Sequence, residues 1–266
     1  NLAFDALHTF HKVAGDGATG VLMKAGRAIT RQVPYWNPDF PRGGKLPRQH
    51  IVASGRPKVV YFASCGARTF GPTPRDPDQR TVPEVLVALI ERAGFELILP
   101  DRARDLCCGQ MWESKGDFRN ADGKRDQLLE AVLRLSEGGR YPVIVDALSC
   151  TKRTLDGVTD IDIVDAVDFI HDQCLPKLTL SRKRQVALHV GCSARTLNLE
   201  GKLQNIAQAC AEDVVRPQGI ECCAFAGEKG LFKPEMNASA LRNIRQLLPE
   251  GLSEGYYANR MCELGL

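Results

Sequence analysis

The feature that most constrains this 266-residue chain is a pattern of cysteines that occurs twice along its length. In each half, a lone cysteine is followed by an adjacent Cys-Cys pair and then by a second lone cysteine. The flanking residues repeat as well: segment 64–69 (SCGART) aligns with segment 191–196 (GCSART), with Cys, Ala, Arg and Thr at the same offsets. Self-similarity of this kind indicates that one supersecondary unit has been duplicated.

The repeat places most of the cysteines in two quartets. They are Cys65, Cys107, Cys108 and Cys150 in the first unit and Cys192, Cys222, Cys223 and Cys262 in the second. Each of these residues follows a predicted strand or lies in a loop between a strand and a helix. Such loops meet at the carboxyl edge of a parallel sheet, where ligands bind, so cysteines distant in sequence can converge in space. We therefore expect both quartets to bind a metal cofactor.

Short β-like apolar runs alternate with helical patterns along most of the chain, which indicates an α/β fold. We predict two pseudo-repeated units, each a small and mostly parallel sheet with helices on both faces. The predicted boundaries are an N-terminal helical segment and linker over 1–50, a first unit over 51–160 and a second unit over 161–266. The predicted strands cover 59–63, 96–99, 143–147, 161–164, 186–190 and 256–258, and the predicted helices cover 82–93, 121–135, 165–174, 203–211 and 238–248, with two shorter helices within 1–33 broken at 15–20.

Composition excludes several classes of protein. The chain is 44% hydrophobic and 25% charged, which is ordinary for a globular protein. A net charge of +3 is too small to argue for nucleic acid or a membrane surface as partner. The sequence contains no run of ~18 apolar residues and no signal-peptide pattern. We expect a protein that is not integral to a membrane, either free in the cytoplasm or peripheral at the inner membrane face.

Cysteines in a chain of this size and kind favour metal ligation or catalysis over disulfides, which staple small secreted proteins. Four thiolates suit either a tetrahedral zinc or an iron–sulfur cluster. Structural zinc prefers cysteines two to four residues apart, whereas adjacent cysteines can reach two irons of a larger cluster, so the pairs favour iron–sulfur. The alternative for the pairs is a vicinal disulfide or burial as small apolar side chains. Cys174 and Cys210 lie in predicted helices and have no counterparts, so we expect them to be buried.

Several motifs resemble those of one family: segment 60–65 (VYFASC), segment 222–230 (CCAFAGEKG) followed by Pro234-Glu235, and segment 256–263 (YYANRMCE). They are similar to the cysteine-rich CCG domain, which is duplicated in one of the subunits of heterodisulfide reductase and in the iron–sulfur component of glycolate oxidase. More closely, they resemble the C-terminal part of long bacterial FAD-linked D-lactate or D-2-hydroxyacid dehydrogenases. The resemblance covers about residue 35 to the end.

This resemblance implies an iron–sulfur electron-transfer role. Clusters in this chain would pass single electrons from a flavin to a quinone or to another protein carrier. Family members of that kind carry a flavin domain upstream, and the first fifty residues contain no FAD-binding candidate and no Cys-x-x-Cys-x-x-Cys run. We therefore expect a C-terminal fragment or a separate subunit, which works beside a flavin-containing domain or subunit, has no dehydrogenase activity alone and holds no FAD itself. No catalytic residue is assigned.

Two departures from the family pattern bear on the cluster. Heterodisulfide reductase units end in Cys-x-x-Cys and supply five thiolates, whereas Cys150 is followed by segment 151–153 (TKR) and Cys262 by segment 263–265 (ELG). A four-thiolate cubane, 4Fe-4S, is the simpler expectation. The glycine that usually follows the second pair is Ala224 here, which costs ~1 kcal/mol if the backbone requires a positive φ.

Three further residues are candidates for tuning a cluster or contacting a substrate. His189 lies three residues before Cys192, where related domains often have histidine, and could carry a proton, contact substrate or hydrogen-bond a cluster sulfur. The alternative is a structural histidine at a strand end whose hydrogen bonds are satisfied within the fold. Arg68 and Arg195 each follow a quartet cysteine by three, and a cation there would raise a cluster's potential or bind a carboxylate. The alternative for both is a surface arginine that caps a helix.

Two other functions stay open at this point. One cluster could itself reduce a disulfide or another substrate, with the missing fifth thiolate leaving an open coordination position. In the second alternative, the cysteines hold zinc in a docking module that has no redox role.

Overall fold

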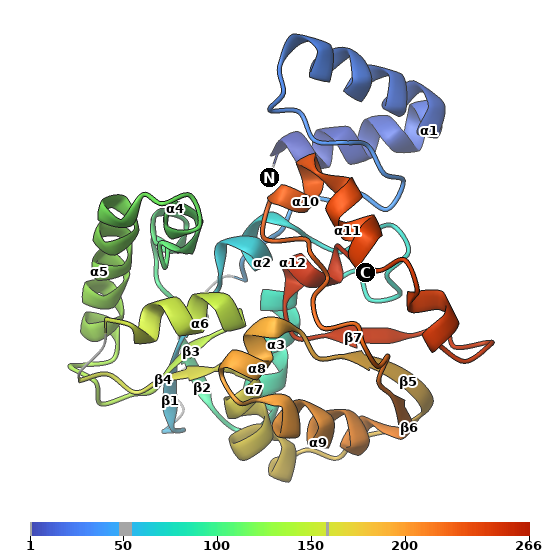
Figure 1. Cartoon of the computed structure of the whole chain (residues 1–266). Coiled ribbons are helices and arrows are strands. Elements are labelled where there is room, and N and C mark those ends of the chain that lie inside the picture. The colour runs from blue at the N-terminus through green and yellow to red at the C-terminus, as the bar shows by residue number, and fades with distance from the viewer. Residues whose placement is uncertain (1, 48–54, 158–159) are drawn as a thin grey trace.

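The computed structural model describes residues 2–47, 55–157 and 160–266 (Figure 1). These residues contain two parallel sheets, with the strand orders β2-β1-β3-β4 and β6-β5-β7, and helices packed against both. The predicted α/β class with two pseudo-repeated units is confirmed. The strands are β1 (Lys58–Phe62), β2 (Glu96–Ile98), β3 (Val143–Val145), β4 (Ile163–Asp165), β5 (Lys183–His189), β6 (Ala211–Val215) and β7 (Gly255–Tyr257).

The helices fall into three groups along the chain. The N-terminal region contains α1 (Leu2–Ile29). The elements around the first sheet are α2 (Cys65–Thr69), α3 (Val82–Arg92), η1 (Ala103–Asp105), α4 (Gln110–Glu113), α5 (Phe118–Leu135), α6 (Leu148–Leu155), α7 (Ala166–Phe169), the π-helix η2 (Ile170–Cys174) and η3 (Leu175–Lys177). Those around the second sheet are α8 (Cys192–Thr196), α9 (Glu200–Cys210), α10 (Lys229–Phe232), α11 (Pro234–Ala240), η4 (Ile244–Leu247) and α12 (Arg260–Glu263).

The strand predicted at 161–164 joins the first sheet, although the sequence pattern placed it at the start of the second unit. It forms β4 and pairs in parallel with β3, with Val143 opposite Ile163. Ile163 is 7% exposed and packs into the core of the first sheet. Sequence order alone does not determine which sheet edge a strand joins, because that choice depends on where its apolar face can be buried.

Two elements of the second unit differ from the prediction. Strand β6 was not predicted, because its exposed Glu212 and Asp213 break the apolar run; such charged residues are common on an edge strand. The helix predicted over 238–248 is replaced by α11 and the separate 3₁₀ turn η4. The turn η4 ends at Leu247, and the next residue, Leu248, has an extended backbone (φ −108°, ψ 138°) as expected for a residue before proline.

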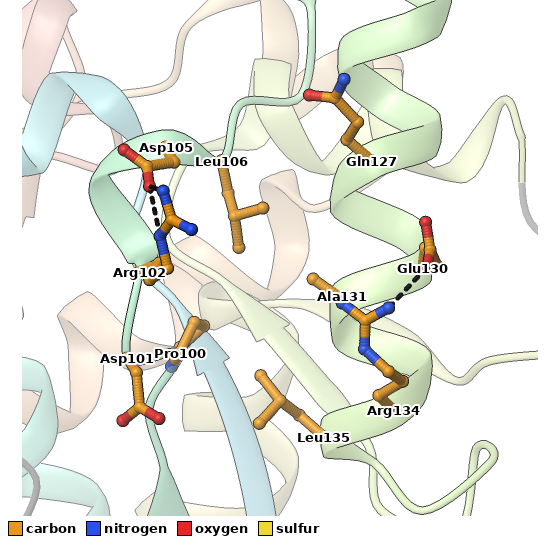
Figure 2. A pocket seen from close by; sticks show the side chains of 10 residues that line it. All are labelled: Pro100, Asp101, Arg102, Asp105, Leu106, Gln127, Glu130, Ala131, Arg134 and Leu135. Atoms are coloured by element: carbon orange, nitrogen blue, oxygen red, sulfur yellow. Dashed lines mark hydrogen bonds and ion pairs between the residues drawn. The ribbon is translucent and has the colours of Figure 1, made fainter.

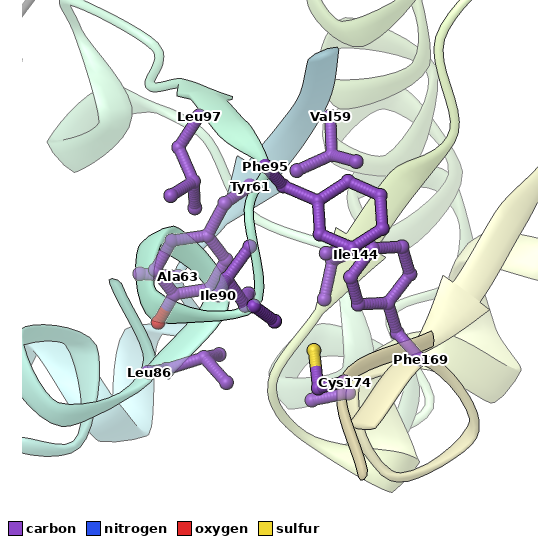
Figure 3. Packing of buried hydrophobic residues seen from close by; sticks show 12 residues of the cluster. Val59, Tyr61, Ala63, Leu86, Ile90, Phe95, Leu97, Ile144, Phe169 and Cys174 are labelled. Carbon is purple, nitrogen blue, oxygen red and sulfur yellow. The ribbon is translucent and has the colours of Figure 1, made fainter. Parts of the chain in front are cut away.

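The first sheet has an apolar core on each face. Val59 and Tyr61 of β1 point to the side covered by α3, α7 and η2, and Val60 points to the side covered by α5. Figure 3 shows the first of these cores, in which the ring of Phe169 from α7 packs against the ring of Phe95 with centroids 4.9 Å apart. Burial on both faces explains why β1 is apolar at nearly every position.

The N-terminal region forms two helical arms joined at a kink. Gly15, with φ 77° and ψ 176°, interrupts the helical backbone of α1, so the predicted break between two short helices is confirmed. The first arm is attached to the rest of the chain by the Asp5 carboxylate, which accepts a hydrogen bond from the Gly43 amide (3.0 Å), and by ring contacts of Phe4 with Phe40 and Phe70. Figure 1 shows α1 at one end of the molecule, next to α10 and α11.

Candidate functional site

The first cysteine quartet assembles where β1 and β3 end. Cys65 is the first residue of α2, Cys107 and Cys108 lie just before α4, and Cys150 lies in α6. Their thiols interact in series: Cys65 with Cys107, Cys107 with Cys108, and Cys108 with Cys150. Cys108 and Cys150 are buried, and the other two are partly exposed. The four thiols converge although Cys65 and Cys150 are 85 positions apart in the sequence.

The second quartet assembles in the same way at the ends of β5 and β7. Cys192 begins α8, the pair Cys222 and Cys223 lies in the loop after β6, and Cys262 lies in α12. The Cys192 thiol interacts with that of Cys222, and the Cys223 thiol interacts with that of Cys262. Cys192 and Cys222 are exposed to solvent, so this quartet is the more open of the two.

None of the ten cysteines, all of which lie in the described part of the chain, forms a disulfide. The vicinal disulfide considered for the pairs is therefore absent from this structure. Among residues 2–47, 55–157 and 160–266, no three His, Cys, Asp or Glu side chains are grouped so as to hold one metal ion. The thiols contact one another in series in the first quartet and as two pairs in the second, and in neither do three of them meet at one metal position.

Each Cys-Cys pair contains one thiol whose pKa is lowered and one whose pKa is raised. In the first, hydrogen bonds from Cys108 and Cys65 hold the pKa of Cys107 far below its ordinary value, and the pKa of Cys108 is raised by its hydrogen bonds with Cys107 and Cys150 and by burial. In the second, the Cys262 thiol lowers the pKa of Cys223 to about 7. Both readily ionised thiols belong to a Cys-Cys pair. Because thiolate is the form that binds metal, the pairs are suited to ligation.

The backbone after each pair turns back toward the sulfurs. Gly109 has φ 88° and Ala224 has φ 52°, so both occupy the left-handed region; the positive φ considered for Ala224 is confirmed. The amide of Gly109 donates to Cys107 Sγ (3.4 Å) and that of Ala224 donates to Cys222 Sγ (3.3 Å). A Cβ on Gly109 would lie 2.1 Å from a backbone oxygen of α5, so only glycine fits there.

The two arginines that follow the lone cysteines make equivalent contacts. Arg68 is 7% exposed, and its guanidinium donates to the carbonyl oxygen of Leu106, the residue before the first pair (2.7 Å). Arg195 donates to the carbonyl oxygen of Glu221, the residue before the second pair (3.3 Å). Each arginine therefore ties the loop of its lone cysteine to the loop of the pair. Arg68 is buried at the site, so the alternative of a surface arginine is wrong for it; Arg195 remains half-exposed, at 33% of its side chain.

His189 and Tyr257 pack beside the second quartet on neighbouring strands. Their rings stack with centroids 4.7 Å apart, and the Tyr257 hydroxyl interacts with the Cys262 thiol. His189 is 5% exposed, and neither ring nitrogen has a hydrogen-bond partner within the described residues. The Ile220 backbone lies close enough to the ring to affect its pKa. The roles considered for His189 beside the quartet stay predictions.

Burial keeps the His189–Tyr257 pair uncharged. Burial, with a smaller contribution from the charge of Arg195, lowers the pKa of His189 below its usual value. Burial and the nearby Cys262 raise the pKa of Tyr257. Gly191 makes room for the tyrosine, because a Cβ on Gly191 would lie 1.7 Å from the Tyr257 hydroxyl oxygen. A neutral imidazole with two open nitrogens therefore lies next to the second quartet.

A buried aspartate, which the sequence did not single out, organises the first quartet. Asp146, at the end of β3, accepts hydrogen bonds from the Tyr61 hydroxyl (2.6 Å) and the Ser64 amide (2.7 Å). These bonds join the residue before α2, which begins at Cys65, to the segment that leads from β3 into α6, which carries Cys150. The only sequence signal was an acidic residue directly after the apolar run 143–145.

The position of a fifth thiolate is filled differently in each unit. Arg153, three residues after Cys150, is 6% exposed and pairs with Glu113 (2.8 Å) and Asp122. Gly265, three residues after Cys262, packs tightly against Phe225, with only 3.0 Å from a built Cβ to that side chain. Each site is thus limited to four cysteines from its own unit.

The loops that carry the two pairs meet each other. Lys115, which follows the first pair, forms an ion pair of 2.8 Å with Glu228, which follows the second. Gly66, next to Cys65, lies against the side chain of Met261, next to Cys262 (3.2 Å from a built Cβ). The two quartets therefore face a common interface between the units, which sequence reasoning did not anticipate.

The surroundings of the first pair include a pocket of about 450 Å³, which lies between η1 and α5 (Figure 2). Charged residues of its lining pair with each other, Arg102 with Asp105 and Arg134 with Glu130, and no quartet thiol lines it. The pocket is therefore separate from the cysteine site.

No helix in the described part of the chain is long and apolar enough to cross a membrane.

Comparison with known protein families agrees with this geometry, whereas comparison with individual proteins gives no match. No curated protein matches the chain. A family model of the cysteine-rich domain named CCG matches residues 59–152 and 186–264, about two thirds of the chain. The matched segments contain all eight quartet cysteines and leave out Cys174. With both segments matched and each forming a cysteine quartet at the ends of parallel strands, the chain belongs to the cysteine-rich CCG domain family.

Proposed function

We propose that this chain is the iron–sulfur electron-transfer module of a flavin-linked 2-hydroxyacid dehydrogenase of the D-lactate type. The observation that carries the proposal is the convergence of four thiols in each unit, from loops far apart in the sequence. The flavin would reside on another domain or subunit, and a quinone or a protein carrier would take the electrons.

The chemistry of the donor set fits an iron–sulfur cluster. Each site offers four thiols, which matches the Cys₄ ligation of a 4Fe-4S cluster. Such a cluster presents several irons, so its thiols need not meet at one point, and the pairwise contacts of the quartets suit it better than they suit a single zinc ion. When bound, the clusters would supply one-electron oxidation and reduction.

The other residues of each site hold the ligands in place and set their electrostatics. Arg68 and Arg195 fix the pair loops and add positive charge. The amides of Gly109 and Ala224 donate to ligand sulfurs. Hydrogen bonds to sulfur, positive charge and burial are the means by which a protein tunes cluster potential. Because the second site is more exposed, the reduction potential of a cluster bound there is expected to differ from that of a cluster in the first site.

A second candidate function is favoured by one observation at the second quartet. Cys192 and Cys222 are exposed, and the His189 ring stacks on Tyr257 beside the same quartet, a combination that could admit a small substrate such as a disulfide and accept a proton from it. In that case the second cluster would be a reducing active site rather than a relay.

Anaerobic purification with iron and sulfide analysis tests the proposal. Two occupied 4Fe-4S sites would give about eight irons and as many sulfides per chain. The variant Cys108→Ala should lose close to half of both, whereas the matched control Cys174→Ala, a buried cysteine outside the quartets, should lose none. Zinc without sulfide would refute the proposal and support the docking module.

The electron-transfer and active-site versions differ in their response to substrate. If the clusters are relays, reduced flavin should produce an EPR signal from the loaded chain, and a small disulfide should leave that signal unchanged. The loaded chain should also oxidise no D-lactate by itself. A disulfide-dependent change in the EPR signal, lost in His189→Ala, would instead identify the second site as reducing.

A further inference from the structure

The duplication places chemically different residues at one equivalent position of the two sheets. In the first sheet Phe62 of β1 lies opposite Val145 of β3, and in the second sheet His189 of β5 lies opposite Tyr257 of β7. The first member of each pair lies three residues before a lone cysteine, and the second member lies five residues before the last cysteine of its unit. A polar aromatic pair in the second unit therefore replaces an apolar pair of the first.

The apolar pair of the first unit offers no hydrogen bond to a ligand sulfur. Phe62 and Val145 are fully buried and belong to one apolar core with Cys108 and Cys150. Neither side chain carries a donor. Two sulfurs of the first quartet thus share a core with side chains that can contribute packing and exclude water, but cannot stabilise negative charge on sulfur.

The polar pair of the second unit brings a hydroxyl group to its quartet. The Tyr257 hydroxyl donates a hydrogen bond to the Cys262 sulfur. It also lies close enough to Cys223 and Cys192 to be affected by their charges. The hydroxyl therefore belongs to the immediate surroundings of three of the four sulfurs in this quartet.

Two neighbours fix the position of this hydroxyl. His189 stacks on the Tyr257 ring, with centroids 4.7 Å apart and ring planes 20° apart. Gly191, the residue before Cys192, leaves the space that the hydroxyl occupies, because a Cβ there would lie 1.7 Å from the hydroxyl oxygen. The ring is thus held from one side while its hydroxyl is directed at the quartet.

The backbone donors to sulfur, in contrast, are the same in both units. The residue after each Cys-Cys pair, Gly109 or Ala224, donates its amide to the first sulfur of that pair. The next residue, Gln110 or Phe225, donates its amide to the second sulfur. The Tyr257 hydroxyl is therefore a donor that the second unit adds to a shared set.

We propose that the Tyr257 hydroxyl, held by His189, donates to the Cys262 sulfur of the loaded second site and raises its reduction potential, an inference that rests on the iron–sulfur function proposed above. Reduction adds negative charge that the ligand sulfurs share, so a donor to sulfur binds the reduced form more strongly than the oxidised form. One electron from the flavin enters this site and leaves to the carrier, and the hydroxyl hydrogen stays on Tyr257 throughout. The hydroxyl thus favours the electron at the quartet whose Cys192 and Cys222 are exposed, where a carrier can approach.

Redox titration of a chain that retains only the second site measures this effect. The chain carries Cys108→Ala, which removes a ligand of the first site, and the EPR signal of the reduced cluster is followed against potential. Tyr257→Phe removes only the hydroxyl and should lower the equilibrium constant for reduction roughly tenfold, which is ~59 mV for one electron. The matched control Tyr256→Phe removes a hydroxyl that donates to Glu254, and it should leave the potential unchanged.

A fluorinated tyrosine tests the opposite direction without removing the side chain. With 3-fluorotyrosine at position 257 the hydroxyl becomes a stronger donor, so the potential of the second site should rise. In a chain carrying Cys223→Ala, which retains only the first site, neither change at position 257 should move the potential.

The outcomes that contradict the proposal are distinct from those that contradict the iron–sulfur function. A second site whose potential does not move with 3-fluorotyrosine would overturn the proposal, even if Tyr257→Phe failed to fold. So would an equal shift in Tyr256→Phe. Zinc without sulfide in the purified chain would overturn the iron–sulfur function, and the role of Tyr257 with it.

Discussion

The buried carboxyl group of Asp165 should make the stability of this chain fall as the pH rises toward neutrality. Asp165 is 2% exposed; its oxygens accept hydrogen bonds from the Thr151 hydroxyl (2.6 Å) and the Val167 amide (2.9 Å). Burial raises its pKa to about 7 despite these bonds, and the charges of Asp168 and Asp146 raise it further. The ionised form is therefore disfavoured in the folded chain.

The sign of the effect follows from proton uptake. The folded pKa of Asp165, about 7, lies above the unfolded value of about 3.9, so the folded chain binds more protons between these values. Its contribution to stability is fully present below pH ~4 and is lost as the pH rises through ~7. Between pH 5 and pH 8 the loss amounts to about 2.5 kcal/mol, at 1.36 kcal/mol per pKa unit.

Urea unfolding of the reduced, metal-free chain at pH 5 and pH 8 measures this loss. Asp165→Asn keeps the helix-capping oxygen and cannot ionise, so it should be stabilised relative to wild type by about 2.5 kcal/mol more at pH 8 than at pH 5. The control Asp126→Asn, at an exposed position of α5, should follow wild type at both values. If the Asp165→Asn and wild-type stabilities change in parallel with pH, the reasoning is refuted.

Three more outcomes are expected. Gly191→Ala should lower stability by about 1–3 kcal/mol in thermal unfolding, because the new methyl group collides with the Tyr257 hydroxyl; Tyr257→Phe in the same chain should recover most of the loss. Tyr61→Phe should cost about 1–3 kcal/mol in urea unfolding, since buried Asp146 loses a donor; no change would show that this bond contributes nothing. Arg68→Met should reduce bound iron after anaerobic reconstitution, as the Leu106 carbonyl loses its donor, and an unchanged iron content would contradict the role assigned to this arginine.

The sequence was sufficient to reveal the duplication, the two quartets and the α/β class, because each rests on local signals. Lone cysteines after apolar runs, matched flanking letters and 2- or 3.6-residue periodicity are all visible without distances. The positive φ at Ala224 could be anticipated for the same reason, since it depends on a turn within a few residues. The break at Gly15 is another local feature of this kind.

Features created by residues far apart in the chain could be found only in the tertiary structure. The membership of β4 in the first sheet, the Asp146 hydrogen bonds, the open nitrogens of His189 and the contact between Lys115 and Glu228 all depend on packing between distant segments. Burial and hydrogen bonding are properties of the space around a side chain, and many packings are compatible with one local pattern. For this protein the sequence determined which cysteines recur in two matching quartets, and only the folded chain decided what surrounds them.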